Sequence, residues 1–168
     1  MPRHSERRFL PHTPEQLFDL VADVEQYPRF LPWCVGAAVS NRREDGFLAE
    51  MVIGFKMLRE RFLSRVDIDP PHRIDVSHYR GPFKHLRNHW IFEPVEGGCM
   101  VDFWVDFEFK SRILDRLIGG LFHEAVRVMV AAFEKRAREL YGDSRSASAR
   151  PGRRGQPSRR YGDFRRPA

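Results

Sequence analysis

The sequence contains few of the residues and patterns on which most enzyme and metal-binding classes depend. It has two cysteines, Cys34 and Cys99, which lie far apart and in no CxxC pair. Closely spaced cysteines build zinc sites and disulfide frameworks, so we expect neither, and two reduced thiols fit a cytoplasmic protein. No HExxH, GxSxG, phosphate-loop or dinucleotide-binding motif occurs. The residues therefore predict no catalytic site, no bound metal and no required cofactor, and the protein is not expected to be an enzyme.

Long apolar runs are also absent. No stretch approaches the roughly 18 apolar residues that read as a membrane-spanning helix, and the N-terminus lacks the apolar segment of a secretory signal. We therefore expect a cytoplasmic protein, and peripheral contact with the inner face of the membrane stays open.

Excess charge is absent from most of the chain, although the formal net charge is +6. Eight arginines and two acids follow Tyr141, which leaves 21 of the 29 basic and 21 of the 23 acidic residues in 1–141. Residues 143–168 are also rich in Ser, Gly and Pro, a composition that cannot bury enough apolar surface to fold. We expect a folded domain over 1–142 and a disordered Arg-rich tail over 143–168. The tail could contact anionic lipid or ribosomal RNA, or serve only as a solubilising extension.

The largest predicted element is a helix over Ser111–Tyr141, where apolar residues recur at helical spacing and no proline intervenes. Ser111 suits the N-cap and Gly142 the C-terminal stop. The helix would be about 45 Å long, so it needs a large apolar partner. Gly119 and Gly120 lie inside it, each costing about 1 kcal/mol relative to alanine. Room for a ligand, close approach of another backbone or a kink would each explain the pair.

Strands precede this helix. A first strand over Ser5–Leu10 is followed by a helix over Pro14–Val24, for which Thr13 is a good N-cap, and by a short helical turn within 25–34. From residue 35 the apolar period changes to two, and hairpin-length turns separate the strands. Six antiparallel strands are predicted, over 35–43, 47–55, 57–69, 73–80, 85–93 and 101–110.

Three stretches resemble the START-like helix-grip superfamily, and in particular its coenzyme Q-binding branch and the related bacterial ribosome association toxins. They are Tyr27–Cys34, Gly81–Leu86 running on to Trp90 and Phe92, and Leu121–Gly142. The resemblance covers about residues 3–142. It implies an α+β helix-grip fold of the START/Bet v 1 type. A curved antiparallel sheet of six to seven strands would wrap around the long C-terminal helix, with two short helices after the first strand.

The resemblance also implies a function. The coenzyme Q-binding branch implies ubiquinone or a similar polyprenyl lipid held in an apolar cavity by a lipid chaperone that supports respiratory electron transport. The toxin branch implies instead a protein that binds the large ribosomal subunit and blocks subunit association. Enzymatic cyclase or dehydratase activity also occurs in this superfamily, and we rank it last because no acid–base constellation is present.

Apolar residues on the inward rows of the strands and the long helix are expected to line the cavity, with plain core packing as the alternative for each. These residues are Phe30, Leu31, Trp33, Phe47, Met51, Ile53, Phe62, Val66, Trp90, Phe103, Val105, Phe107, Leu117, Leu121, Phe122, Val128 and Met129.

Three polar residues, Glu60, His78 and Asn88, also fall on inward rows in the predicted register. A buried polar group must find a partner, so these side chains could bond one another or meet the carbonyl oxygens of a quinone head group. A register slip of one residue would turn all three to solvent.

Overall fold

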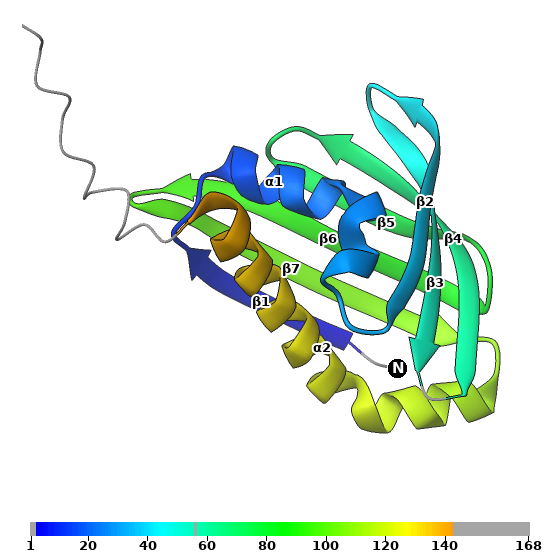
Figure 1. Ribbon diagram of the computed structural model, residues 1–168. Helices are drawn as coiled ribbons and strands as arrows, with labels where there is room; N and C mark the ends of the chain where they lie inside the picture. Colours follow the sequence, from blue (N-terminus) through cyan, green and yellow to red (C-terminus); the bar gives the residue numbers. More distant parts are fainter. Residues whose placement is uncertain (1–2, 56, 143–168) are drawn as a thin grey trace, which may run out of the picture.

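Alternating strands joined by short turns form one seven-stranded antiparallel sheet. The order across the sheet is β1-β7-β6-β5-β4-β3-β2, so β2 to β7 form a meander and β1 closes the far edge beside β7. The computed structural model describes residues 3–55 and 57–142 (Figure 1), and the tail predicted over 143–168 lies outside them. The strands are β1 (Arg3–Leu10), β2 (Cys34–Arg43), β3 (Gly46–Phe55), β4 (Leu58–Asp69), β5 (Arg73–Arg80), β6 (Phe83–Val95) and β7 (Gly98–Phe109).

Two short helices follow β1. α1 (Pro14–Ala22) begins at the predicted N-cap, because the Thr13 hydroxyl accepts a hydrogen bond from the Gln16 backbone and the Gln16 side chain accepts one from the Thr13 backbone. The 3₁₀ helix η1 (Val24–Arg29) comes next. Both lie on the concave side of the sheet (Figure 1), where α1 packs against β5 and β6 and η1 packs against β2.

The long helix α2 (Arg112–Tyr141) starts and stops where the sequence predicts. The Ser111 hydroxyl caps it by accepting a hydrogen bond from the Leu114 backbone, and Gly142 ends it with a φ of 78°. An added Cβ on Gly119 or Gly120 would meet no described heavy atom within 4 Å. Close approach of another backbone therefore does not explain this glycine pair. Figure 1 shows α2 bent, with its first turns at an angle to the rest.

The inward side chains form two apolar clusters. The first is centred on Phe92, Ile74 and Cys99, and packs α1, η1 and the later turns of α2 against the sheet. The second packs the early and middle turns of α2 against the ends of β6 and β7, around Phe83 and Phe107. Strands supply more of the buried residues in these clusters than α2 does, so the sheet carries most of the core.

Both cysteines are free and buried, and burial raises the pKa of the Cys99 thiol to about 11.

Candidate functional site

Most of the predicted lining residues point to the concave side and enter one of the two clusters. The first cluster takes Phe30, Leu31, Phe47, Met51, Ile53, Val66, Trp90 and Met129. The second cluster takes Phe62, Phe103, Val105, Phe107 and Phe122. Trp33 belongs to neither and packs its ring against Phe55 at a centroid distance of 5.8 Å.

Aromatic rings connect these walls. Trp90 lies between the sheet and α2, with ring centroids 4.5 Å from Phe103 and 5.3 Å from Phe133. In the second cluster Phe83 stacks on Phe109 at 4.7 Å and meets Phe62 edge-on at 5.3 Å. The concave face is therefore lined by flat, polarisable surfaces of the kind that a planar apolar ligand contacts well.

Three helix residues predicted to line the cavity lie elsewhere. Leu117, Leu121 and Val128 are 37% to 52% exposed and enter neither cluster. At about 100° per residue they share one sector of α2, on the side away from Phe122 and Val126. Apolar residues occupy about half of the circumference in the early part of this helix, so sequence spacing alone did not show which part of that arc meets the sheet.

A row of polar side chains marks the boundary between the two clusters. Ser64 lies in β4 between Phe62 of the second cluster and Val66 of the first, and Asn88 lies in β6 between residues 86 and 90 in the same way. His78 of β5 is paired with Ser64, and its ring centroid lies 5.7 Å from that of Phe83. Asn88 pairs with the residue two positions before His78, which makes His78 and Asn88 diagonal neighbours.

These polar atoms are buried without partners. Within the described part of the chain, Ser64 Oγ, His78 Nε2 and Asn88 Oδ1 have no hydrogen-bond partner. Buried polar groups of native proteins are nearly always satisfied, and leaving one unpaired costs about 1–3 kcal/mol. Three such atoms lie on neighbouring strands inside an otherwise apolar face, and they form a candidate site for a polar group.

Local backbone geometry brings Ser64 and His78 together. The pairing of β4 with β5 is irregular between Leu63 and Ser64, and such bulges re-aim side chains. The turn after β5 then passes close to β4, because Gly81 adopts a φ of 143° and has no side chain to collide with Phe62. The polar row therefore depends on a close approach that only glycine permits.

Burial and charge favour the neutral form of His78. Burial lowers the pKa of its imidazole, the positive charge of Lys110 lowers it further, and a hydrogen bond with the Gly81 backbone acts in the opposite direction. A neutral imidazole keeps one N–H donor and one acceptor nitrogen. A bond that raises the pKa is one that the ring donates to the Gly81 carbonyl, so the unpartnered Nε2 is left as an acceptor at neutral pH.

The structure does not bring together all three polar residues that were predicted to meet a head group. Glu60 lies on the inward row but four residues from Ser64 along β4, or about 13 Å, so it does not join His78 and Asn88. Ser64 was not predicted as a site residue, although its place as a small polar residue on an inward row was the available signal. Arg136 was also missed. Its guanidinium lies 5.5 Å from the Phe30 ring centroid, and its Nε is buried without a partner among the described residues.

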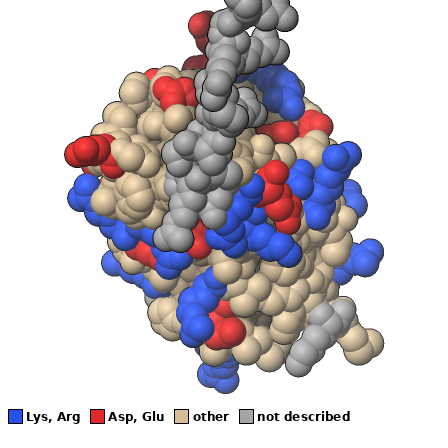
Figure 2. All heavy atoms as spheres, turned by 60° about the vertical axis from the view of Figure 1, so that its left-hand side comes forward, with Lys and Arg blue, Asp and Glu red and all other residues tan. Residues whose placement is uncertain are grey.

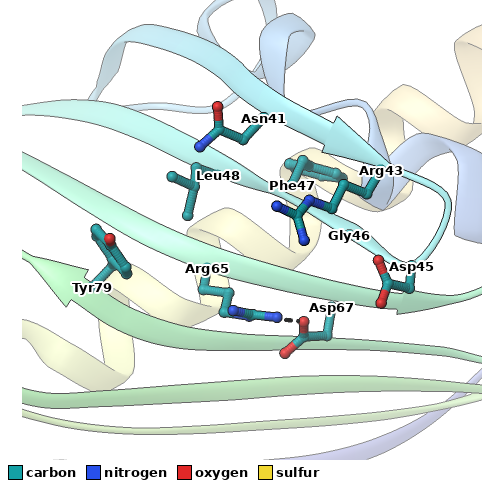
Figure 3. Close-up of a pocket in the computed structure, with 9 residues that line it drawn as sticks. All are labelled: Asn41, Arg43, Asp45, Gly46, Phe47, Leu48, Arg65, Asp67 and Tyr79. Carbon is teal, nitrogen blue, oxygen red and sulfur yellow. Dashed lines mark hydrogen bonds and ion pairs between the residues drawn. The ribbon is translucent and has the colours of Figure 1, made fainter.

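A second, polar hollow lies on the outward side of β2 to β5, with a volume of about 210 Å³ (Figure 3). Phe47 alone belongs to the predicted lining, and the charged side chains are of both signs. Arg65 donates to Asp67 at 3.1 Å across the floor of the hollow. This hollow is lined by Asn41, Arg43, Asp45, Gly46, Phe47, Leu48, Arg65, Asp67 and Tyr79. It is distinct from the apolar concave face and shares none of its polar row.

Neither a metal-binding cluster nor a membrane-spanning helix is present among residues 3–55 and 57–142. No group of three or more His, Cys, Asp and Glu side chains lies close enough there to hold a metal ion. None of the helices in this part combines the length and apolar character needed to cross a membrane.

The fold and the inward-facing site together define a START-like helix-grip protein with an apolar concave face against a long helix. The chain belongs to the polyketide cyclase / dehydrase and lipid transport family, whose model matches residues 10–134. This description covers both catalysts and lipid carriers, so membership leaves catalysis open, and the absence of enzyme activity stays a prediction.

Relatives of both expected branches are found. The chain is 40% identical over 137 residues to a ribosome association toxin RatA of Rickettsia prowazekii, covering 79% of this chain and 94% of the relative. It is 38% identical over 144 residues to a mitochondrial coenzyme Q-binding protein COQ10 homolog B of Xenopus laevis, covering 83% of this chain but only 59% of the relative. The solution structure of an 18 kDa protein from Caulobacter crescentus is 42% identical, with a TM-score of 0.71, and the match covers 85% of this chain and 100% of that one.

Proposed function

We propose that the protein binds ubiquinone or a similar polyprenyl lipid on its concave face and carries it without chemical change, as a lipid chaperone in respiratory electron transport. The observation that carries the proposal is the row of unpartnered polar atoms at the boundary of the two apolar clusters. The Ser64 hydroxyl can donate to a quinone carbonyl, and the unpartnered Nε2 of neutral His78 can accept from a quinol hydroxyl. The Asn88 amide can present oxygen or nitrogen by rotation, so it suits either a quinone or a quinol.

Extraction tests the proposal directly. Protein purified from its native host is extracted with organic solvent, and the extract is analysed by mass spectrometry. We expect a co-purifying quinone in the wild type. A purified wild type that carries no quinone, and takes none up from a detergent-solubilised supply, would show the proposal to be wrong.

Replacement of Asn88 separates ligand binding from folding. Asn88→Leu removes a buried amide whose Oδ1 lacks a partner, so we expect the unliganded protein to gain about 1 kcal/mol of stability. Affinity for a short-tailed ubiquinone analogue should fall about tenfold, since one hydrogen bond is lost. Urea unfolding and fluorescence titration measure the two quantities. Arg87→Leu is the control, because Arg87 is exposed on the same strand, and it should leave affinity unchanged. Lower stability of the Asn88 variant would mean that the amide serves packing and not a ligand.

The lowered pKa of His78 predicts a pH dependence of stability. The folded pKa lies below the ordinary value of 6.5, so the unfolded chain takes up the proton first as the pH falls. Stability from this group is therefore complete above the ordinary pKa and is lost as the pH falls through it toward the folded pKa. The free energy of unfolding, measured at pH about 7.5 and about 5.5, should drop more for the wild type than for His78→Gln. Equal drops in the free energy of unfolding of the two proteins would show that the lowered pKa of His78 does not contribute to the pH dependence of stability.

A ribosome-directed role is the second candidate. It is favoured by the 94% coverage of the Rickettsia toxin, against 59% of the Xenopus coenzyme Q-binding protein. Sucrose-gradient profiles after overexpression test it. Free subunits should accumulate at the expense of 70S particles if the protein blocks subunit association, and an unchanged ratio would count against this role.

A further inference from the structure

An apolar strip stays exposed along the early turns of α2. Ile113, Leu117 and Leu121 follow one another at four-residue spacing, and Ile113 is 73% exposed. The adjoining side of the same turns is partly buried, since Leu114 and Ile118 pack against the second cluster. The early turns of α2 therefore carry a broad apolar arc, and only part of it has a partner among the described residues. We call Ile113, Leu117 and Leu121 the α2 strip.

Another apolar side chain projects from the same end of the molecule. Met57, at the turn between β3 and β4, is fully exposed. Figure 1 shows this turn and the first turns of α2 at one end. The packing agrees, because Phe62 of β4 lies in the same cluster as Leu114 and Ile118. Grouped exposed apolar side chains of this kind mark an interaction surface.

The charge around the α2 strip is positive. Lys110, Arg112 and Arg116 are exposed, and within residues 3–55 and 57–142 none of them has an ion-pair partner. Asp115 is the one acidic residue in 110–121. Its carboxylate accepts a hydrogen bond from the Phe109 backbone at 3.3 Å, at the end of β7. Elsewhere the charges are mixed, and on the face shown in Figure 2 Asp and Glu lie among the band of Lys and Arg.

The exposed apolar side chains and the positive charge around them together distinguish between possible binding partners of this surface. A second copy docking through a two-fold axis would bring the same three cations of each chain together, which is unfavourable. An anionic bilayer meets both properties at once, because apolar side chains enter the boundary between headgroups and acyl chains while Lys and Arg meet the phosphates. We propose that the α2 strip, Met57 and the flanking cations form a docking surface for an anionic lipid bilayer.

The proposal goes beyond the proposed ligand binding and does not require it. It places the early turns of α2 at the membrane, and these turns also pack against the wall of the concave face through Leu114 and Ile118. A lipid could then exchange with the bilayer at this end of the molecule. Vesicle docking and quinone extraction are separate measurements, so either proposal can fail while the other stands.

Vesicle co-sedimentation of the full chain tests the docking surface. Vesicles of phosphatidylcholine alone are compared with vesicles that also contain phosphatidylglycerol. We expect binding to the anionic vesicles, and a loss of at least about tenfold in the Ile113→Gln, Leu117→Gln double variant. Arg112→Gln with Arg116→Gln should weaken binding about fivefold per charge removed and flatten its salt dependence.

Leu140→Gln is the matched control. Leu140 is an exposed leucine of α2 (49%), but it lies 23 residues after Leu117, or about 35 Å along the helix. The control carries the same Arg-rich C-terminus, so any contribution from residues 143–168 is constant. It should bind as the wild type does, and circular dichroism should show all variants folded, because every substituted side chain is exposed.

Three outcomes would overturn the proposal. The wild type does not bind anionic vesicles, or the double variant on the α2 strip binds as well as the Leu140 control. The third is a concentration-dependent dimer in sedimentation velocity that the double variant abolishes while vesicle binding is unchanged. A second copy, and not a bilayer, would then cover the α2 strip.

Discussion

Phe92→Ala is expected to lower the free energy of unfolding by about 3–5 kcal/mol, in the range of buried Phe-to-Ala changes. Phe92 is 1% exposed at the centre of the first cluster. Its ring meets Phe18 of α1 edge-on at 6.0 Å and lies parallel to Trp90 at 6.4 Å. Phe92 therefore joins the sheet to α1. Its replacement by alanine leaves a cavity between these elements, because they cannot all move to fill it. Urea and thermal unfolding followed by far-UV circular dichroism measure the loss, which corresponds to roughly 10–20 °C in Tm.

Phe9→Ala is the matched control for this prediction. Phe9 is the same residue type, also lies on a strand, and is 46% exposed. We expect its replacement to change stability by about 0.5 kcal/mol or less. Similar losses in the two variants would mean that the core does not pass through Phe92.

Gly81→Ala is expected to cost about 2–5 kcal/mol, from strain and overpacking together. An added Cβ would lie 2.7 Å from Phe62 Cβ and 3.0 Å from Phe62 Cα. The φ of 143° is also one that a side-chain-bearing residue rarely adopts. Neither β4 nor the turn can move without displacing Ser64 and His78. We therefore expect the variant to lose ligand affinity as well as stability, which titration with the ubiquinone analogue measures.

Gly119→Ala and Gly120→Ala provide controls of the opposite sign. Neither added Cβ would meet a described heavy atom within 4 Å, and alanine favours the helix over glycine. Each change should raise the free energy of unfolding by about 0.5–1 kcal/mol. A loss at either position would indicate that the bend of α2 needs glycine. A gain at Gly81 would show that the close approach to Phe62 is not tight.

Local patterns predicted the elements closely. The alternation of β7 and the capping residues Thr13 and Ser111 gave strands and helices that the structure confirms. Boundaries differed where neighbours extended an element. β1 begins at Arg3 and not at Ser5, because β7 continues to pair with it. α1 ends at Ala22, where η1 takes over the chain.

The candidate site was predictable in part. The period of two placed His78 and Asn88 on inward rows, and both point inward with unpartnered atoms. Their adjacency to Ser64 was not predictable, because it depends on pairing between distant strands and on the irregularity beside Leu63. Glu60 shares their row in sequence, but its distance along β4 separates it from them.

The sequence by itself determined the long helix, its ends and the inward rows of the strands, because each of these depends on spacing along the chain or on local capping. The family was recognised from the resemblance of three stretches of sequence. Only the tertiary structure decided which side of α2 meets the sheet, and it left Leu117 exposed where the sequence predicted a cavity wall. A helix with a broad apolar arc can bury different parts of that arc. The curved sheet packs against the part that holds Leu114 and Ile118, and Ile113 and Leu117 stay exposed.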